Sequence, residues 1–188
     1  VFGRCFPGGW NGYFVAGKGN PAGRIISFDD SSVFGYGRKS EYYRWTTSLE
    51  YRLFAVDRKK IVPQDLYPRS PEKVRQASKH PEVKIEPPRP VPYRWERTVP
   101  ILVRAMVKAG DHLVVAGPKR LYDELSAIQE IESPGVQAKI RAQREAWEEG
   151  AELHVVSVED GTFAGMIKLE CLPVWDGIAA ADGALFVS

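Results

Sequence analysis

The sequence predicts an all-β fold built from antiparallel hairpins, and a recurring local pattern carries this prediction. Short apolar segments are followed by a turn of polar residues or glycine and then by a second apolar segment, over residues 24–36, 101–116 and 176–188. In the last of these the turn is Asp182-Gly183, and Asp-Gly supplies the positive φ angles that a tight hairpin turn requires. The order of strand, turn and strand therefore occurs three times.

The segments of each hairpin can be assigned in chain order. The expected strands and turns, written as strand, turn and returning strand, are 24–28, 29–32 and 33–36; then 101–108, 109–111 and 112–116; then 176–181, 182–183 and 184–188. Each of the first two hairpins is followed by a further strand, at 51–57 and at 153–158.

The strand at 153–158 continues through the turn Glu159-Asp160-Gly161 into another strand at 162–169. The best-preserved unit thus has four strands, at 101–108, 112–116, 153–158 and 162–169. A four-stranded antiparallel meander repeated along a chain is typical of one blade of a β-propeller. We therefore interpret residues 1–188 as the C-terminal part of one β-propeller domain.

Two insertions interrupt the repeat. Residues 58–100 contain nine prolines among many charges, which favours extended chain over a surface, with one short helix expected at 70–77. Residues 118–150 are expected to be helical, because Leu121, Leu125, Ile128 and Ile131 recur at helical spacing. Pro134-Gly135 should interrupt this helix, and a second helical stretch should end at Gly150 as its C-cap.

The ends of the sequence suggest a piece of a longer polypeptide. The first residue is Val1 and not Met, and the last repeat contains only two of its four strands. Since a folded sheet avoids an open apolar edge, we expect strands outside this chain to complete the ring, and we do not expect the piece to fold alone. Cys5 and Cys171 either form a disulfide or remain unpaired core residues.

Composition argues against two classes of partner. The 26 Lys and Arg residues nearly balance the 24 Asp and Glu residues, for a net charge of +2, so no global field favours nucleic acid. No apolar run approaches the roughly 20 residues that a membrane-spanning helix needs. The chain is therefore expected to contain no transmembrane segment.

Several segments resemble a known family. Residues 21–39 and 41–47, the segments 103–107 and 115–118, and the segments 154–161 and 176–181 are similar to the C-terminal region of PQQ-like β-propeller repeat proteins of the planctomycete type. The resemblance covers nearly the whole chain apart from 58–92. It implies a propeller fold and an extracytoplasmic location, periplasmic or secreted; most members of the family have no established activity, so it implies no cofactor by itself.

The residues argue against a cofactor or metal in this chain. A quinone site needs aromatic planes, cationic groups and usually a calcium ion, and quinoprotein alcohol dehydrogenases add adjacent cysteines, which this sequence lacks. PQQ is therefore not expected. His80, His112 and His154 have no Cys or His partner at ligand spacing, so no metal site is predicted. No spacing typical of a catalytic nucleophile occurs, and no catalytic residue is predicted.

Two groups of residues remain as candidate binding surfaces. Arg104 and Asp176 are charged residues in apolar first strands, where they would face the central channel, either as a structural pair between blades or as a ligand or partner site. The second group is an aromatic and basic stretch that includes Arg38, Tyr43, Arg44 and Trp45. Tyr, Trp and Arg favour protein interfaces, although packing between blades explains them equally well.

Three functional hypotheses follow. The first is a non-catalytic extracytoplasmic propeller that acts as a binding or assembly scaffold, with a protein or the N-terminal part of the same propeller as its partner. The second is part of a quinone- or haem-dependent oxidoreductase whose site lies in the missing N-terminal portion. The third is a carbohydrate-binding or carbohydrate-active propeller with aromatic platforms, for which hydrolysis would need a pair of channel-facing carboxylates.

Overall fold

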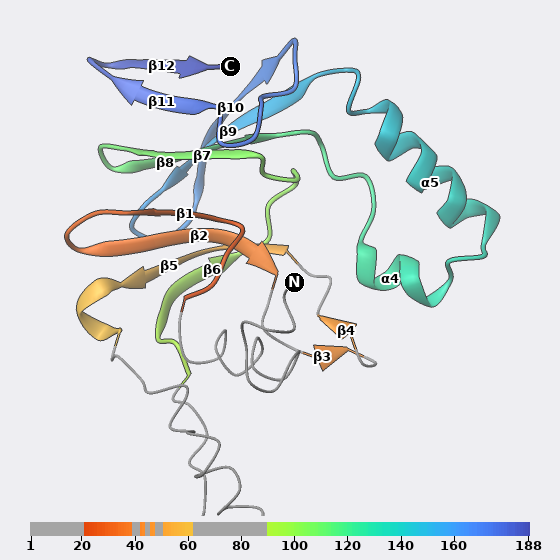
Figure 1. Ribbon diagram of the computed structural model, residues 1–188, viewed down its shortest axis with the longest axis horizontal. Helices are drawn as coiled ribbons and strands as arrows, with labels where there is room; N and C mark the ends of the chain where they lie inside the picture. Colours follow the sequence, from red (N-terminus) through yellow and green to blue (C-terminus); the bar gives the residue numbers. More distant parts are fainter. Residues whose placement is uncertain (1–20, 39–41, 44–45, 48–50, 62–89) are drawn as a thin grey trace, which may run out of the picture.

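The computed structural model describes residues 21–38, 42–43, 46–47, 51–61 and 90–188 (Figure 1). Its strands are β1 (Ile25–Phe28), β2 (Ser32–Arg38), β3 (Tyr42–Tyr43), β4 (Thr46–Thr47), β5 (Tyr51–Asp57), β6 (Tyr93–Arg97), β7 (Ala105–Ala109), β8 (His112–Gly117), β9 (Ala151–Ser157), β10 (Phe163–Leu169), β11 (Ile178–Ala181) and β12 (Ala184–Val187). Its helices are the 3₁₀ helix η1 (Arg58–Lys60), α4 (Glu124–Gln129) and α5 (Pro134–Glu145).

The strands form antiparallel sheets, which confirms the mainly β architecture predicted from the sequence. One four-stranded sheet has the order β1-β2-β5-β6 and the other has the order β7-β8-β9-β10. Within each four-stranded sheet, neighbouring strands are also consecutive along the chain, except that the small hairpin β3–β4 lies between β2 and β5. The hairpin β11–β12 forms a further two-stranded sheet. The predicted meander at 101–169 is thus confirmed.

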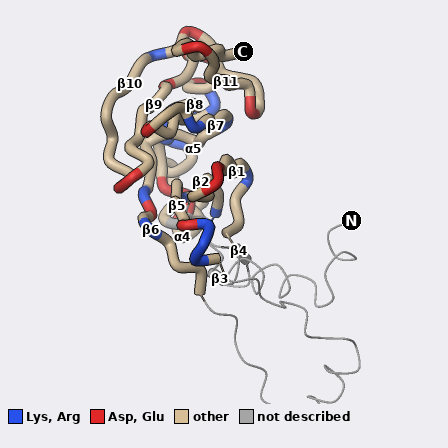
Figure 2. The backbone as a smooth tube through the Cα atoms, turned by 90° about the vertical axis from the view of Figure 1, so that its left-hand side faces the viewer, with Lys and Arg blue, Asp and Glu red and all other residues tan. Residues whose placement is uncertain are grey.

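The sheets stack in chain order, with β11–β12 at the top of Figure 1 and the β1-containing sheet below β7–β10. The first strands contact one another directly, since β1 packs against β7 and β7 packs against β11. A view turned by 90° shows the same stack, with basic and acidic positions interspersed along it (Figure 2). Helices α4 and α5 lie to one side of the sheets.

Apolar side chains fill the spaces between the sheets. The larger cluster lies between the two four-stranded sheets and includes Phe34, Leu53, Leu113 and Val115, all of which are almost fully buried. A smaller cluster on the opposite face of β8 and β9 includes Val114 and Leu153 and extends to Ile178 of β11. Alternate residues of β8 therefore serve two interfaces, as the two-residue period of a strand requires.

The expectation that residues 58–100 lie outside the sheets is wrong for Tyr93–Arg97. These residues form β6, the fourth strand of the first sheet, paired with β5. Trp95 is buried in the larger core cluster, and its indole Nε1 donates a hydrogen bond to the Val158 carbonyl at 3.0 Å. Prolines on both sides of this short strand concealed its alternating pattern.

The predicted strand at 101–108 begins later than expected. Regular pairing starts at Ala105, whereas Ile101 forms an isolated antiparallel bridge with Lys119. Residues 102–104 still run alongside the end of β8, because the backbone amides of Leu102 and Arg104 donate to the carbonyls of Pro118 and Ala116. Likewise, the segment before Ile178 is a turn and not the start of a strand.

The helical insertion is confirmed, with different boundaries. Asp123 caps α4 by accepting a hydrogen bond from the Ser126 amide at 2.7 Å, and Pro134 occupies the first turn of α5. Helix α5 ends at Glu145, so Gly150 is not its C-cap; this glycine has a φ of 109° and directly precedes β9. Gln143 of α5 is buried and fixes the helix to the sheet through hydrogen bonds to the backbone of Lys119 and Leu121.

Other expectations lie outside the described residues, among them the helix at 70–77 and the environment of Cys5. Cys171 is exposed. Across the described part of the chain, no helix combines the length and the apolar character needed to cross a membrane.

An ion pair between the first two sheets predicts acid-sensitive stability. Asp29, in the β1–β2 turn, lies 3.0 Å from the Lys108 ammonium and accepts hydrogen bonds from Ser31 and Ser32. The contact with Lys108, followed by those with Ser31, holds the pKa of Asp29 well below its ordinary value of 3.8. Its contribution to stability is therefore complete above the pKa of the unfolded state and is lost as the pH falls below that value.

We expect Asp29→Asn to lower the free energy of unfolding by about 1 kcal/mol at pH 7, and we expect this difference to shrink as the pH falls from 5 to 2. Urea denaturation across this range measures it. Asp30→Asn is the matched control, because Asp30 is exposed in the same turn and its side chain makes no hydrogen bond or ion pair with a described residue. An equal loss for both variants at every pH would contradict the role of the ion pair.

Candidate functional site: an arginine–aromatic cluster

Charged residues stand immediately before the first strand of the first two sheets, and a third lies two residues before β11. These residues are Arg24, Arg104 and Asp176. The Arg24 and Arg104 amides donate to the carbonyls of Tyr36 and Ala116, at 2.7 and 2.8 Å, and so occupy equivalent positions beside the second strands. Since β1, β7 and β11 pack side by side, these positions lie along one side of the stack.

The structure brings the sequence-predicted residues Arg104 and Asp176 together through their backbones. The Asp176 amide donates to the Arg104 carbonyl at 2.8 Å, and the Arg104 Nε donates to the Pro173 carbonyl at 3.0 Å. The two side chains form no ion pair within the described part of the chain. Asp176 is exposed and has a φ of 57°, a conformation that Asp and Asn tolerate better than most residues.

Arg24 links this loop to the first sheet. Its guanidinium lies 4.8 Å from the centre of the Trp175 ring and 5.9 Å from the centre of the Tyr51 ring, and it donates to the Tyr51 hydroxyl at 3.4 Å. A cation over an aromatic face within about 6 Å is attracted by the ring quadrupole. Arg24 and Trp175 are both exposed, Trp175 to 45%, so these stacked groups form part of the surface.

Arg38, another sequence-predicted residue, also approaches the Tyr51 ring. Its guanidinium is 5.0 Å from the centre of that ring and pairs with Glu124 of α4 at 3.3 Å. Burial raises the pKa of Glu124, while the charges of Arg38 and Arg120 oppose this shift. The ion pair with Arg38 thus joins α4 to the site, and Arg120 lies in the segment that precedes this helix.

A buried tyrosine supports the platform from below. Tyr36 stacks on Tyr51 with ring centres 5.4 Å apart and an interplanar angle of 15°. Its side chain is almost fully buried, and burial raises the pKa of its phenol well above the ordinary value. Tyr36 is thus a neutral structural group that holds the Tyr51 ring, which both arginines approach.

We define the arginine–aromatic cluster as Arg24, Arg38, Arg104, Arg120, Tyr51 and Trp175. Sequence reasoning found Arg38 and Arg104 in it but missed the other four, since each of these is an ordinary residue in its local segment. One signal was available: Arg24 precedes its strand just as Arg104 does. The contact of Arg24 with Trp175 had no local signal, because 151 residues separate them.

The remaining candidates are only partly described. Tyr43 lies in β3, opposite Thr46 of β4, and its side chain, together with Arg44 and Trp45, lies outside what the structure describes. Among the described residues, no group of three His, Cys, Asp or Glu side chains is placed to hold a metal ion. His154 is buried and pairs with Glu152 at 2.9 Å across alternate positions of β9.

No protein-family model matches this sequence, and no curated protein matches it either.

Proposed function

We propose that this chain is the C-terminal part of a β-propeller that acts as a non-catalytic, extracytoplasmic binding or assembly scaffold, with its ring completed by strands outside the chain. The observation that carries the proposal is the repeated contact between first strands, β1 with β7 and β7 with β11. Four-stranded meanders whose first strands meet in chain order are what successive propeller blades require. The extracytoplasmic location rests on the resemblance to PQQ-like repeat proteins.

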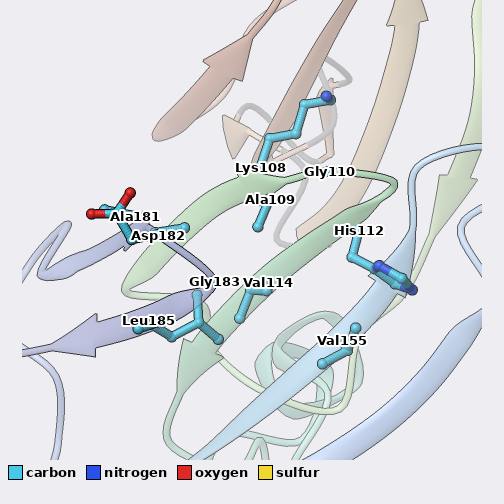
Figure 3. Close-up of a pocket in the computed structure, with 12 residues that line it drawn as sticks. Lys108, Ala109, Gly110, His112, Val114, Val155, Ala181, Asp182, Gly183 and Leu185 are labelled. Atoms are coloured by element: carbon cyan, nitrogen blue, oxygen red, sulfur yellow. The ribbon is translucent and has the colours of Figure 1, made fainter.

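The two-stranded third sheet supports the completion of the ring. Phe186 of β12 is 60% exposed, and Leu185 and Val187 on the other face of this strand are 41% and 36% exposed. Beside them, a cleft of about 570 Å³ lies between β11–β12 and the second sheet. Figure 3 shows Leu185 of β12 across this cleft from Val114 of β8, with Val155 on the strand next to β8. Further strands of the third sheet would cover this apolar surface.

The free edge of β12 supports the same conclusion. The Ser188 amide donates to the Gly177 carbonyl at 2.9 Å. In an antiparallel pair the amides of alternate residues point toward the same neighbouring strand, so the amides of Phe186 and Ala184 also point toward β11. The amides of Leu185 and Val187 then point away from β11. Unpaired edges of this kind are normally covered or paired in folded proteins.

Hydrogen exchange of the natural polypeptide tests the proposal. If strands from elsewhere complete this sheet, we expect the Leu185 and Val187 amides to exchange at least about 100-fold more slowly than in an open edge, because opening then requires local unfolding. The Ala184 and Phe186 amides are the internal control, since their partner is β11 in either case. Fast exchange of Leu185 and Val187 alone would overturn the completed ring.

A further inference from the structure

We propose that the arginine–aromatic cluster binds an acidic protein segment, one in which several Asp or Glu side chains lie close together. This inference rests on the proposed scaffold function and assigns the chemistry of its partner. It starts from guanidinium groups that pair with no carboxylate among the described residues. Neither Arg24, Arg104 nor Arg120 has a carboxylate within ion-pair distance among the described residues, whereas Arg38 has Glu124.

Arg104 is constrained without being neutralised. Its Nε is held by the Pro173 carbonyl, and its two terminal nitrogens have no hydrogen-bond partner within the described residues. These two nitrogens present the fork that matches a carboxylate in two parallel hydrogen bonds. A held side chain also loses less conformational entropy on binding.

Arg24 is held in a similar way. Its guanidinium lies against Trp175 and Tyr51, and the only hydrogen bond that its side chain makes to described residues is the 3.4 Å contact with the Tyr51 hydroxyl. Because both Arg24 and Trp175 are exposed, an approaching carboxylate can reach the charge while its chain covers the indole. Exposed Trp and Arg of this kind dominate the binding energy of many protein interfaces.

The local charge balance favours a moderately acidic protein segment over a densely charged polyanion. Three carboxylates belong to residues beside the cluster: Asp123 and Glu124 at the start of α4, and Asp176, whose backbone amide donates to the Arg104 carbonyl. Glu124 is paired with Arg38, and Asp123 caps α4. A small positive excess suits a few carboxylates, whereas nucleic acids and heparin are held by many more cationic contacts. Asp176 is exposed, and its side chain makes no hydrogen bond or ion pair with a described residue. Its negative charge would repel an acidic segment and so weaken binding.

Fluorescence anisotropy of the natural polypeptide provides the test. The probe is a fluorescein-labelled peptide with six glutamates interleaved with Gly and Ser, and the control peptide has glutamine at the same positions. We expect the glutamate peptide to bind with a Kd below about 1 mM at low salt and more weakly as salt screens the charges. The glutamine peptide should bind at least about tenfold more weakly, since charged hydrogen bonds are then lost.

Three variants are expected to change the affinity for the glutamate peptide in different ways. Arg24→Gln combined with Arg104→Gln should weaken binding of the glutamate peptide by about tenfold or more. Asp176→Asn should tighten it by roughly twofold to threefold, since it removes a repulsive charge and Asn tolerates the same backbone conformation. Arg141→Gln is the matched control, because Arg141 is exposed on α5 and its side chain makes no hydrogen bond or ion pair with a described residue; its effect should stay within about twofold.

The inference is overturned if the glutamate peptide does not bind, if the glutamine peptide binds equally, or if Arg141→Gln weakens binding as much as the double variant. It is also overturned if a heparin oligosaccharide binds through Arg24 and Arg104 while the peptide does not, which would indicate an anionic polysaccharide as partner. Slow exchange at Leu185 and Val187 together with absent peptide binding would leave the completed ring intact and reject only this partner.

Discussion

Replacing Trp95 with alanine should lower the free energy of unfolding by about 3–5 kcal/mol, the range measured for truncation of a large buried aromatic side chain. Trp95 is 6% exposed and belongs to the core cluster between the two four-stranded sheets, with its ring 6.4 Å from that of Phe34. The indole also connects β6 to the β9–β10 turn through the Val158 carbonyl. Its removal would leave a cavity and take away one of the two donors to this carbonyl, the other being Arg94.

Two further variants separate these contributions, measured for each by urea denaturation. Trp95→Phe keeps much of the apolar volume but loses the Nε1 donor, so we expect an intermediate loss of about 1–3 kcal/mol. Trp147→Ala is the matched control, because this tryptophan, which follows α5, is 44% exposed and should cost less than about 1 kcal/mol. A similar loss for Trp95→Ala and Trp147→Ala would contradict the position of β6 in the first sheet.

Gly117→Ala should destabilise the protein by about 2–3 kcal/mol, the upper part of the range for overpacking, because the new methyl group has no space. A Cβ atom at this position would lie 2.0 Å from the Leu102 carbonyl oxygen and 3.2 Å from the Val103 Cα. Both are backbone atoms of the segment 101–104, which runs alongside the end of β8 and is hydrogen-bonded to it. Relief of the clash therefore requires the backbone of Leu102 and Val103 to move, and Arg104, the next residue in the chain, would move with it.

The matched control is Gly165→Ala in β10, where an added Cβ would meet no atom within 4 Å. It changes the unfolded chain in the same way and should be neutral or slightly stabilising, by a few tenths of a kcal/mol. Thermal unfolding of both variants measures the difference. If Gly117→Ala proved as stable as Gly165→Ala, the close approach of residues 101–104 to β8 would be wrong. A displaced Arg104 should also weaken binding of the glutamate peptide.

The local elements of this protein are determined by its sequence. The hairpin at 176–188 is an example: Asp182 and Gly183 have φ angles of 50° and 75°, as expected for Asp-Gly in a tight turn. The turn at Glu159-Asp160-Gly161 is another, because Gly161 has a φ of 74° and Asp160 accepts from the Thr162 amide. Strand β5 has the predicted bounds, since five of its seven residues are hydrophobic and the strand lies inside a sheet. These features depend on neighbours in the chain.

The arrangement of the sheets and the candidate site were decided only by the tertiary structure. Strand β6 becomes visible only when β5 offers it a partner and Trp95 finds the core beneath it. Arg24 contacts Trp175 only because β1, β7 and β11 pack in succession, which places the segments that precede these strands along one side of the stack. A turn is set by the dihedral preferences of two or three residues, whereas a contact across 151 residues depends on how whole sheets bury their apolar faces.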